Sequence, residues 1–291
     1  MGPPAARMPP HRQTLSMRDS FYQVLEESAG GLESTTARVR STDHTTGPWA
    51  AQFQHAGPPS ALLTRAVHRL GGLPVDALPA RLSFDILSPV PVADLIVTAR
   101  TLRSGRRVAL AEATLATAGS PGRPVMALRA WLLRRAQPPI AGLPDTPTTP
   151  APLLRDDMTA LSRPPGWHPG YLDAVQWLWV EGSFEAPGPA AVWTRLAVDL
   201  VEGEAPEPIE RLVAVADSAS GISAVASPAD LVFVNTDLTL HLTREPAGEE
   251  IWMRSQTTVD GLGIGRTTGE LGDRGGAVAH SAQCLFVEPR T

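Results

Sequence analysis

Hydrophobic and polar positions along this chain follow two different periods. Over residues 58–70 apolar residues recur every three or four positions, which is typical of a helix with one buried face. That apolar stripe consists of Leu62, Leu63, Ala66, Val67 and Leu70. Strand-like apolar runs follow it over residues 80–87, 95–117 and 124–135. The first half of the chain therefore predicts one helix followed by several long strands.

The second half repeats this order. The pattern predicts a helix over residues 208–225, followed by strands over residues 233–242, 250–271 and 277–289. Residues 103–115 and 259–271 occupy the same place in the two halves, and each predicts a long hairpin that turns at Ser-Gly or Asp-Gly. The chain is thus predicted to be an α+β protein built from a duplicated unit.

A proline-rich stretch divides the two units. Residues 137–170 contain too many prolines for a helix or a central strand, so we interpret them as an extended linker. The start, residues 1–18, is also proline-rich and lacks the apolar core of a signal peptide, so we expect a disordered tail. The predicted units are then residues 19–136 and 171–291.

Composition excludes several classes of function. The chain has 25 arginines and no lysine, against 30 acidic residues, and a net charge of −5 gives no argument for nucleic acid. No apolar run approaches the ~18 residues of a membrane helix. The single cysteine, Cys284, excludes an internal disulfide, and the seven histidines show no metal-ligand spacing. A reducing cytoplasm is the expected location.

Four sequence blocks carry a resemblance to a known family. They are "WAAQFQHAGPPSALLTRAV" (residues 49–67), "RLVAVADSASG" (211–221), "FVNTDLTLHLTREP" (233–246) and "AHSAQCLFVEP" (279–289). In this order they resemble the type II acyl-CoA thioesterases over about residues 19–289. The resemblance implies a double hotdog fold, in which two tandem repeats each wrap a curved antiparallel sheet around a long central helix.

The resemblance also implies a catalytic site. In that family an aspartate, a threonine-like residue and a glutamine hold a water molecule, and these positions match Asp217, Asn235 with Thr236 beside it, and Gln283. A carboxylate beside a buried helix face is costly unless it is paired or functional, so Asp217 is a candidate base. Direct attack by that carboxylate is the alternative. Gln283 has a second interpretation, as a satisfied polar group of the core.

The start of the first helix predicts an oxyanion site. His55, Ala56 and Gly57 precede two prolines, which suit a helix start because they lack N–H groups. The amide of Gly57, together with Ala56, is then expected to be free to bind a developing oxyanion. The family has Gly-Gly here, whereas this chain has Ala56-Gly57. We expect His55 to position the site; a simple tight turn is the other interpretation.

Comparison of the two halves indicates one composite site per chain. When the two halves are aligned, Val67 or His68 stands where the second half has Asp217. Ala130 likewise stands where the second half has Gln283. The second half, in turn, has no His-x-Gly turn before its helix. The losses are complementary, as expected for one active site between the halves.

The predicted function is hydrolysis of acyl thioesters, with acyl-CoA as the expected substrate and no metal or other cofactor. A homo-oligomer is expected. Two alternatives stay open. One is another hotdog enzyme that dehydrates or transfers an acyl group bound to CoA or a carrier, and the other is a non-hydrolytic acyl-binding or partner protein.

Overall fold

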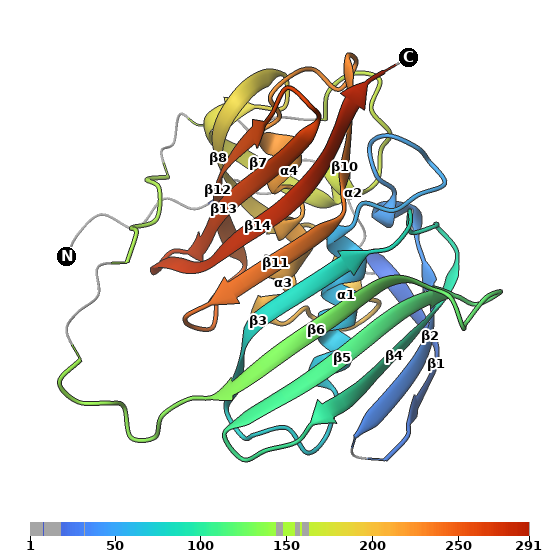
Figure 1. The fold of residues 1–291 in the computed structure, drawn as a ribbon, viewed down its shortest axis with the longest axis vertical. Coiled ribbons are helices and arrows are strands. Elements are labelled where there is room, and N and C mark those ends of the chain that lie inside the picture. The colour runs from blue at the N-terminus through green and yellow to red at the C-terminus, as the bar shows by residue number, and fades with distance from the viewer. Residues whose placement is uncertain are drawn as a thin grey trace.

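The computed structural model describes residues 8, 19–31, 33–143, 148–154, 158 and 163–290. Most of the predicted tail over residues 1–18 and part of the predicted linker lie outside these ranges. The described part is mostly strand, with short helices between the strands (Figure 1).

The first half contains one long helix and six strands. Helix α1 (Gly57–His68) lies between β2 and β3 in sequence. The strands are β1 (Ser20–Ala29), β2 (Ser34–Ser41), β3 (Ala77–Ile86), β4 (Asp94–Arg103), β5 (Val108–Thr117) and β6 (Pro124–Arg134). A 3₁₀ turn, η1 (Asp43–Thr45), precedes α1. The strands pair antiparallel in the order β3-β6-β5-β4-β2-β1, which confirms the strands predicted over residues 80–135.

The second half repeats this plan with shorter helices. Its helices are α2 (Tyr171–Ala174), α3 (Pro208–Ala216) and α4 (Ala219–Ile222). Its strands are β7 (Val175–Ser183), β8 (Ala186–Leu196), β9 (Asp199–Val201), β10 (Leu231–Asn235), β11 (Asp237–Leu242), β12 (Glu250–Val259), β13 (Ile264–Asp273) and β14 (Gly276–Pro289). The hairpin predicted to turn at Asp-Gly within residues 259–271 is present, and its two arms are β12 and β13.

One sheet runs through both halves. Strand β3 pairs antiparallel with β11, with Phe84 opposite Leu238. At the far end of the same sheet β1 pairs parallel with β9, with Ser20 opposite Asp199. The sheet curves around α1 and α3, which pack against each other on its inner side (Figure 1). The start of α1 and the end of α3 are therefore neighbours.

Helix α1 is more deeply buried than its apolar stripe predicts. Every residue from Gly57 to Val67 is buried, because the sheet covers one side of the helix and α3 covers the other. Even the Arg65 side chain is 6% exposed, and it forms ion pairs with Glu27 and Glu204. The buried charge is tolerated because these carboxylates neutralise it.

The second predicted helix is interrupted. The pattern predicts one helix over residues 208–225, whereas α3 ends at Ala216 and α4 resumes at Ala219. The break falls at Asp217, whose backbone carbonyl accepts a hydrogen bond of 3.2 Å from the Gln283 side-chain amide. That carbonyl is thus bonded to the sheet at the point where the helix stops, and the Asp217 side chain lies at a helix end.

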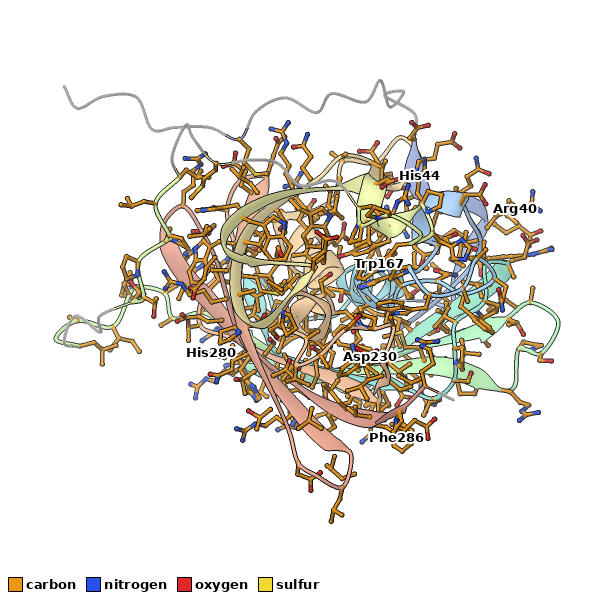
Figure 2. All side chains as sticks on the ribbon, turned by 90° about the horizontal axis from the view of Figure 1, so that it is seen from above. Arg40, His44, Trp167, Asp230, His280 and Phe286 are labelled. Carbon is orange, nitrogen blue, oxygen red and sulfur yellow. The ribbon has the colours of Figure 1, made fainter. Side chains whose placement is uncertain are left out.

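The linker meets the outer face of the sheet in the second half of the chain. The Trp193 indole donates to the Pro152 carbonyl over 3.2 Å, and the Ala277 amide donates to the Thr149 carbonyl over 2.9 Å. Elsewhere the outer face of β14 is uncovered in the described part of the chain: in Figure 2 His280 and Phe286 point away from the helices, and Phe286 is 45% exposed.

Candidate active site

Asp217 lies at the junction of α3 and α4, where it is 5% exposed. Helix α3 carries it there because its apolar residues, with Ile209, Leu212 and Val213 among them, are buried in the core. The helix ends at this position, so the carboxylate points out of the helix end toward the inner face of β14. An isolated carboxylate at this depth would be strongly destabilising, so its partners decide what it does.

Two amide side chains bind the same oxygen of this carboxylate. The Asn235 Nδ2 donates to Asp217 Oδ1 over 2.9 Å, and the Gln283 Nε2 donates to Oδ1 over 3.1 Å. The Ser220 hydroxyl donates to Asn235 Oδ1 over 3.0 Å, which fixes the orientation of that amide. Gln283 is 1% exposed, and its Oε1 has no hydrogen-bond partner in the described part of the chain.

His55 approaches the other oxygen of Asp217. Its Nδ1 is 3.5 Å from Asp217 Oδ2. The imidazole stacks flat on the Tyr171 ring, with centroids 3.8 Å apart and an interplanar angle of 8°. Burial lowers the pKa of His55 below its ordinary value, and the charge of Asp217 opposes this shift only in part. The imidazole is therefore neutral at pH 7.

The first amide of α1 is already engaged. The Gly57 N–H donates to His55 Nδ1 over 3.0 Å, whereas the sequence predicts that this N–H is free. Ala56, which caps the helix, has no acceptor for its own N–H among the described residues. Its carbonyl accepts from the Ser60 amide over 3.1 Å and from the Ser60 hydroxyl over 2.7 Å. The helix start thus presents one free and one occupied donor.

Helix packing requires glycine at position 57. A Cβ atom there would overlap the carbonyl oxygen of Ala214 on α3. The absence of a side chain lets α1 and α3 approach closely enough for His55 to reach Asp217.

The structure separates the two candidates for the middle position. Asn235 ends β10 and binds Asp217. Thr236 is exposed, and its hydroxyl donates to the Cys284 carbonyl over 3.4 Å, on the other side of the sheet. The structure brings His55, Gly57, Asp217, Asn235 and Gln283 together, but it does not bring Thr236 to the carboxylate.

Sequence reasoning missed two neighbours of the site. Tyr171, directly after the linker, holds the His55 ring by stacking; its hydroxyl donates to the Ala214 carbonyl over 3.0 Å. Burial raises the pKa of Tyr171 well above its ordinary value. Ser220 fixes the amide of Asn235. No spacing in the sequence signals Tyr171, because its contacts are to residues far away in the chain.

Both halves of the chain contribute to this one constellation. His55 and Gly57 come from the first half, and Asp217, Asn235 and Gln283 come from the second. Ala130, the counterpart of Gln283, is a buried core residue. Such a geometry can hold a water beside a carboxylate and place backbone N–H groups near it.

Among the described residues no group of three or more His, Cys, Asp or Glu side chains could hold a metal ion.

Comparison with protein families identifies the class of the protein. Residues 45–133 match the model of the acyl-CoA thioesterase N-terminal domain. Residues 155–287 match the model of the acyl-CoA thioesterase C-terminal domain. The two matches cover most of the chain in the expected order, so the chain belongs to the acyl-CoA thioesterase family and is a thioesterase. A comparison with curated proteins gave no match.

Solved structures share the fold. A protein assigned as a thioesterase II from Thermobifida fusca has a TM-score of 0.70 at 17% identity, over 90% of this chain and 95% of that one. A hot dog protein from Alicyclobacillus acidocaldarius gives 0.68 at 16%, over 91% and 97%. The acyl-CoA thioesterase II TesB2 from Mycobacterium marinum gives 0.63 at 16%, over 92% and 97%. These likenesses establish the hotdog fold.

None of the helices in the described part of the chain has the length and hydropathy needed to span a bilayer.

Proposed function

We propose that this thioesterase hydrolyses acyl-CoA with a water molecule that Asp217 deprotonates. The observation that carries the proposal is the unequal environment of the two carboxylate oxygens. Oδ1 accepts from both Asn235 and Gln283, while no described residue donates a hydrogen bond to Oδ2, which lies 3.5 Å from His55 Nδ1. Oδ2 is therefore the oxygen left to accept a proton from water.

Gln283 supplies the second acceptor that such a water needs. Its Oε1 is buried and lacks a partner among the described residues, although a buried amide oxygen normally has one. A water between Oδ2 of Asp217 and Oε1 of Gln283 would donate one hydrogen to each. Its lone pair would then be directed at a thioester carbonyl carbon. Attack forms the new C–O bond, and collapse of the intermediate breaks the C–S bond.

The start of α1 supplies the stabilisation of the oxyanion. The N–H groups of Ala56 and Gly57 lie at the positive end of the helix dipole, where negative charge is favoured. One such donor is worth about 3 kcal/mol of transition-state stabilisation in other enzymes. CoA enters this scheme as part of the substrate. The homo-oligomeric state and a cytoplasmic location stay predictions.

Isosteric replacement of Asp217 tests the proposal. Asp217→Asn keeps the size of the side chain but removes the base, so kcat for acyl-CoA hydrolysis should fall by about 100-fold or more. The matched control is Asp237→Asn, on the neighbouring strand β11, where Oδ1 accepts from the Cys284 amide over 2.7 Å. The measurement is thiol release from a panel of acyl-CoAs. Equal rates for Asp217→Asn and the unsubstituted protein would refute the role of Asp217.

A further inference from the structure

One ring nitrogen of His55 lies between the proposed base and the proposed oxyanion donor. Nδ1 is 3.0 Å from the Gly57 amide nitrogen and 3.5 Å from Asp217 Oδ2. The Gly57 N–H points at Nδ1, so Nδ1 carries its lone pair and the imidazole proton is on Nε2. The ring cannot turn away easily, because it is stacked on Tyr171 and the His55 backbone amide donates to the Thr45 carbonyl over 2.8 Å.

Nδ1 can form a hydrogen bond with only one of its two neighbours, Gly57 N–H and Asp217 Oδ2, at a time. A lone pair that accepts the Gly57 N–H repels the Oδ2 carboxylate oxygen, since both are acceptors. Once Nδ1 carries a proton, it becomes a donor to Oδ2 and can no longer accept from Gly57. The protonation state of a single nitrogen thus decides whether the Gly57 N–H is occupied or free.

We infer that His55 is a proton relay that releases the Gly57 N–H for the oxyanion when it accepts the proton of the attacking water through Asp217. This inference rests on the proposed function and adds to it the step in which the oxyanion site is completed. It explains why the Gly57 N–H, which is expected to be free, donates to His55 Nδ1 in the structure. This N–H stays bonded to Nδ1 until Asp217 has taken the proton from water.

The step balances in protons and bonds. Water loses a proton to Asp217 Oδ2 while its oxygen bonds to the thioester carbonyl carbon. The proton moves from Oδ2 to Nδ1, and the Gly57 N–H turns to the carbonyl oxygen, which now carries the negative charge. Collapse restores the carbonyl and breaks the C–S bond. The proton returns through Oδ2 to the leaving sulfur, so the thiol departs and Gly57 again donates to Nδ1.

The groups around His55 are few. Among the residues that the structure describes, Asp217, at the end of α3, is the charged group that faces the ring, and Tyr171 of α2 is the titratable group stacked on it. The first turn of α1 contributes no acidic side chain. Burial favours the neutral ring, and Asp217 favours the protonated one. The relay therefore starts neutral and gains its proton next to an anion that stabilises it.

Two measurements test the relay. His55→Gln keeps an acceptor for Gly57 but cannot carry the proton, so kcat should fall by about 100-fold while KM changes less than about threefold. The kcat/KM of the unsubstituted protein should fall at acidic pH as His55 becomes protonated. The residual kcat/KM of His55→Gln should not show the part of this fall that His55 protonation causes. His44→Gln, on the preceding turn η1, is the matched control and should leave the profile unchanged.

The second measurement needs no variant to fold. With the full chain labelled with nitrogen-15 on glycine and histidine, the Gly57 amide and His55 Nδ1 signals should titrate with one midpoint. A Gly57 amide that ignores the titration of Nδ1 would overturn the relay. So would normal turnover by His55→Gln when Asp217→Asn is inactive, and in that case the proposed function stands. If the unsubstituted protein hydrolyses no thioester, the proposed function fails, whereas the titration still tests the coupling.

Discussion

The two oxygens of Asp217 have different partners, and Asn235 is the residue that creates much of this difference. Its amide nitrogen binds Oδ1 because its own oxygen is occupied by the Ser220 hydroxyl. An asparagine thus donates to Oδ1 at the position where the resemblance implies a threonine. Placing the Asn235 amide beside Asp217 and Gln283 costs free energy of desolvation, and these two hydrogen bonds offset that cost.

Alanine at position 235 should separate it from its neighbour. Asn235→Ala removes one of two donors to a buried anion, so kcat should fall by about 10-fold or more, because a hydrogen bond to a charged group is worth roughly 1.5–3 kcal/mol. Thr236→Ala is the adjacent control and should stay within about twofold of the unsubstituted rate. Thiol release at saturating acyl-CoA measures both. A larger loss for Thr236→Ala than for Asn235→Ala would reassign the middle position.

The sequence could not choose between these two residues. They are adjacent, so they face opposite sides of the sheet, and strand pairing alone does not tell which side a given residue takes. The break between β10 and β11 falls at Thr236, whose amide donates to the Cys284 carbonyl over 3.1 Å. The side of the sheet that Gln283 faces was easier to predict, since it lies in a regular alternating strand between buried Leu285 and Val287 on one side and Ala279 on the other.

The contact between α1 and α3 depends on one glycine. Gly57→Ala would force the Cβ against the Ala214 carbonyl and separate the helices. We expect a loss of about 1–3 kcal/mol in the free energy of unfolding, as for other overpacked sites. Gly221→Ala is the matched control, because nothing lies within 4 Å of a Cβ on that α4 residue. Urea denaturation of both variants measures the difference; equal stability would mean that the helices have room to move.

The sequence predicts the strands well where apolar and polar residues alternate. The long strands β4, β5, β12, β13 and β14 agree with the alternating runs in the sequence. Helix α3 was predicted too long, because residues after Asp217 keep a helical pattern while Gln283 bonds the Asp217 carbonyl from a strand 66 positions away. Nothing local signals that bond. The helical stripe of α1 likewise could not reveal that α3 covers its other side.

The two predicted units share one sheet, and this has consequences for stability. Strand pairs β3–β11 and β1–β9 join the halves at two places, and α1 packs on α3 between them. We therefore expect one cooperative unfolding transition. Circular dichroism reports strands of both halves, while tryptophan fluorescence reports mainly the second half, which holds Trp177, Trp179, Trp193 and Trp252. The two denaturation curves should coincide. Two separate transitions would show that the halves unfold independently.

Duplication made the composite site predictable in outline. The first half has the turn before its helix and the second has the acid and the amide, and the structure places these groups around His55 Nδ1 and Asp217. The state of the Gly57 N–H could not be predicted. It depends on a ring orientation that Tyr171 sets from a distant part of the chain.

The decisive experiment follows the oxygen of the attacking water. A single turnover with the enzyme in excess over acyl-CoA is run in oxygen-18 water and quenched, and the peptide containing Asp217 is weighed by mass spectrometry. If Asp217 activates the water, the label enters the carboxylic acid product and the peptide keeps its mass throughout. A peptide that gains an acyl group during the turnover, or oxygen-18 after it, would show that the carboxylate itself attacks the thioester and would contradict the proposed mechanism.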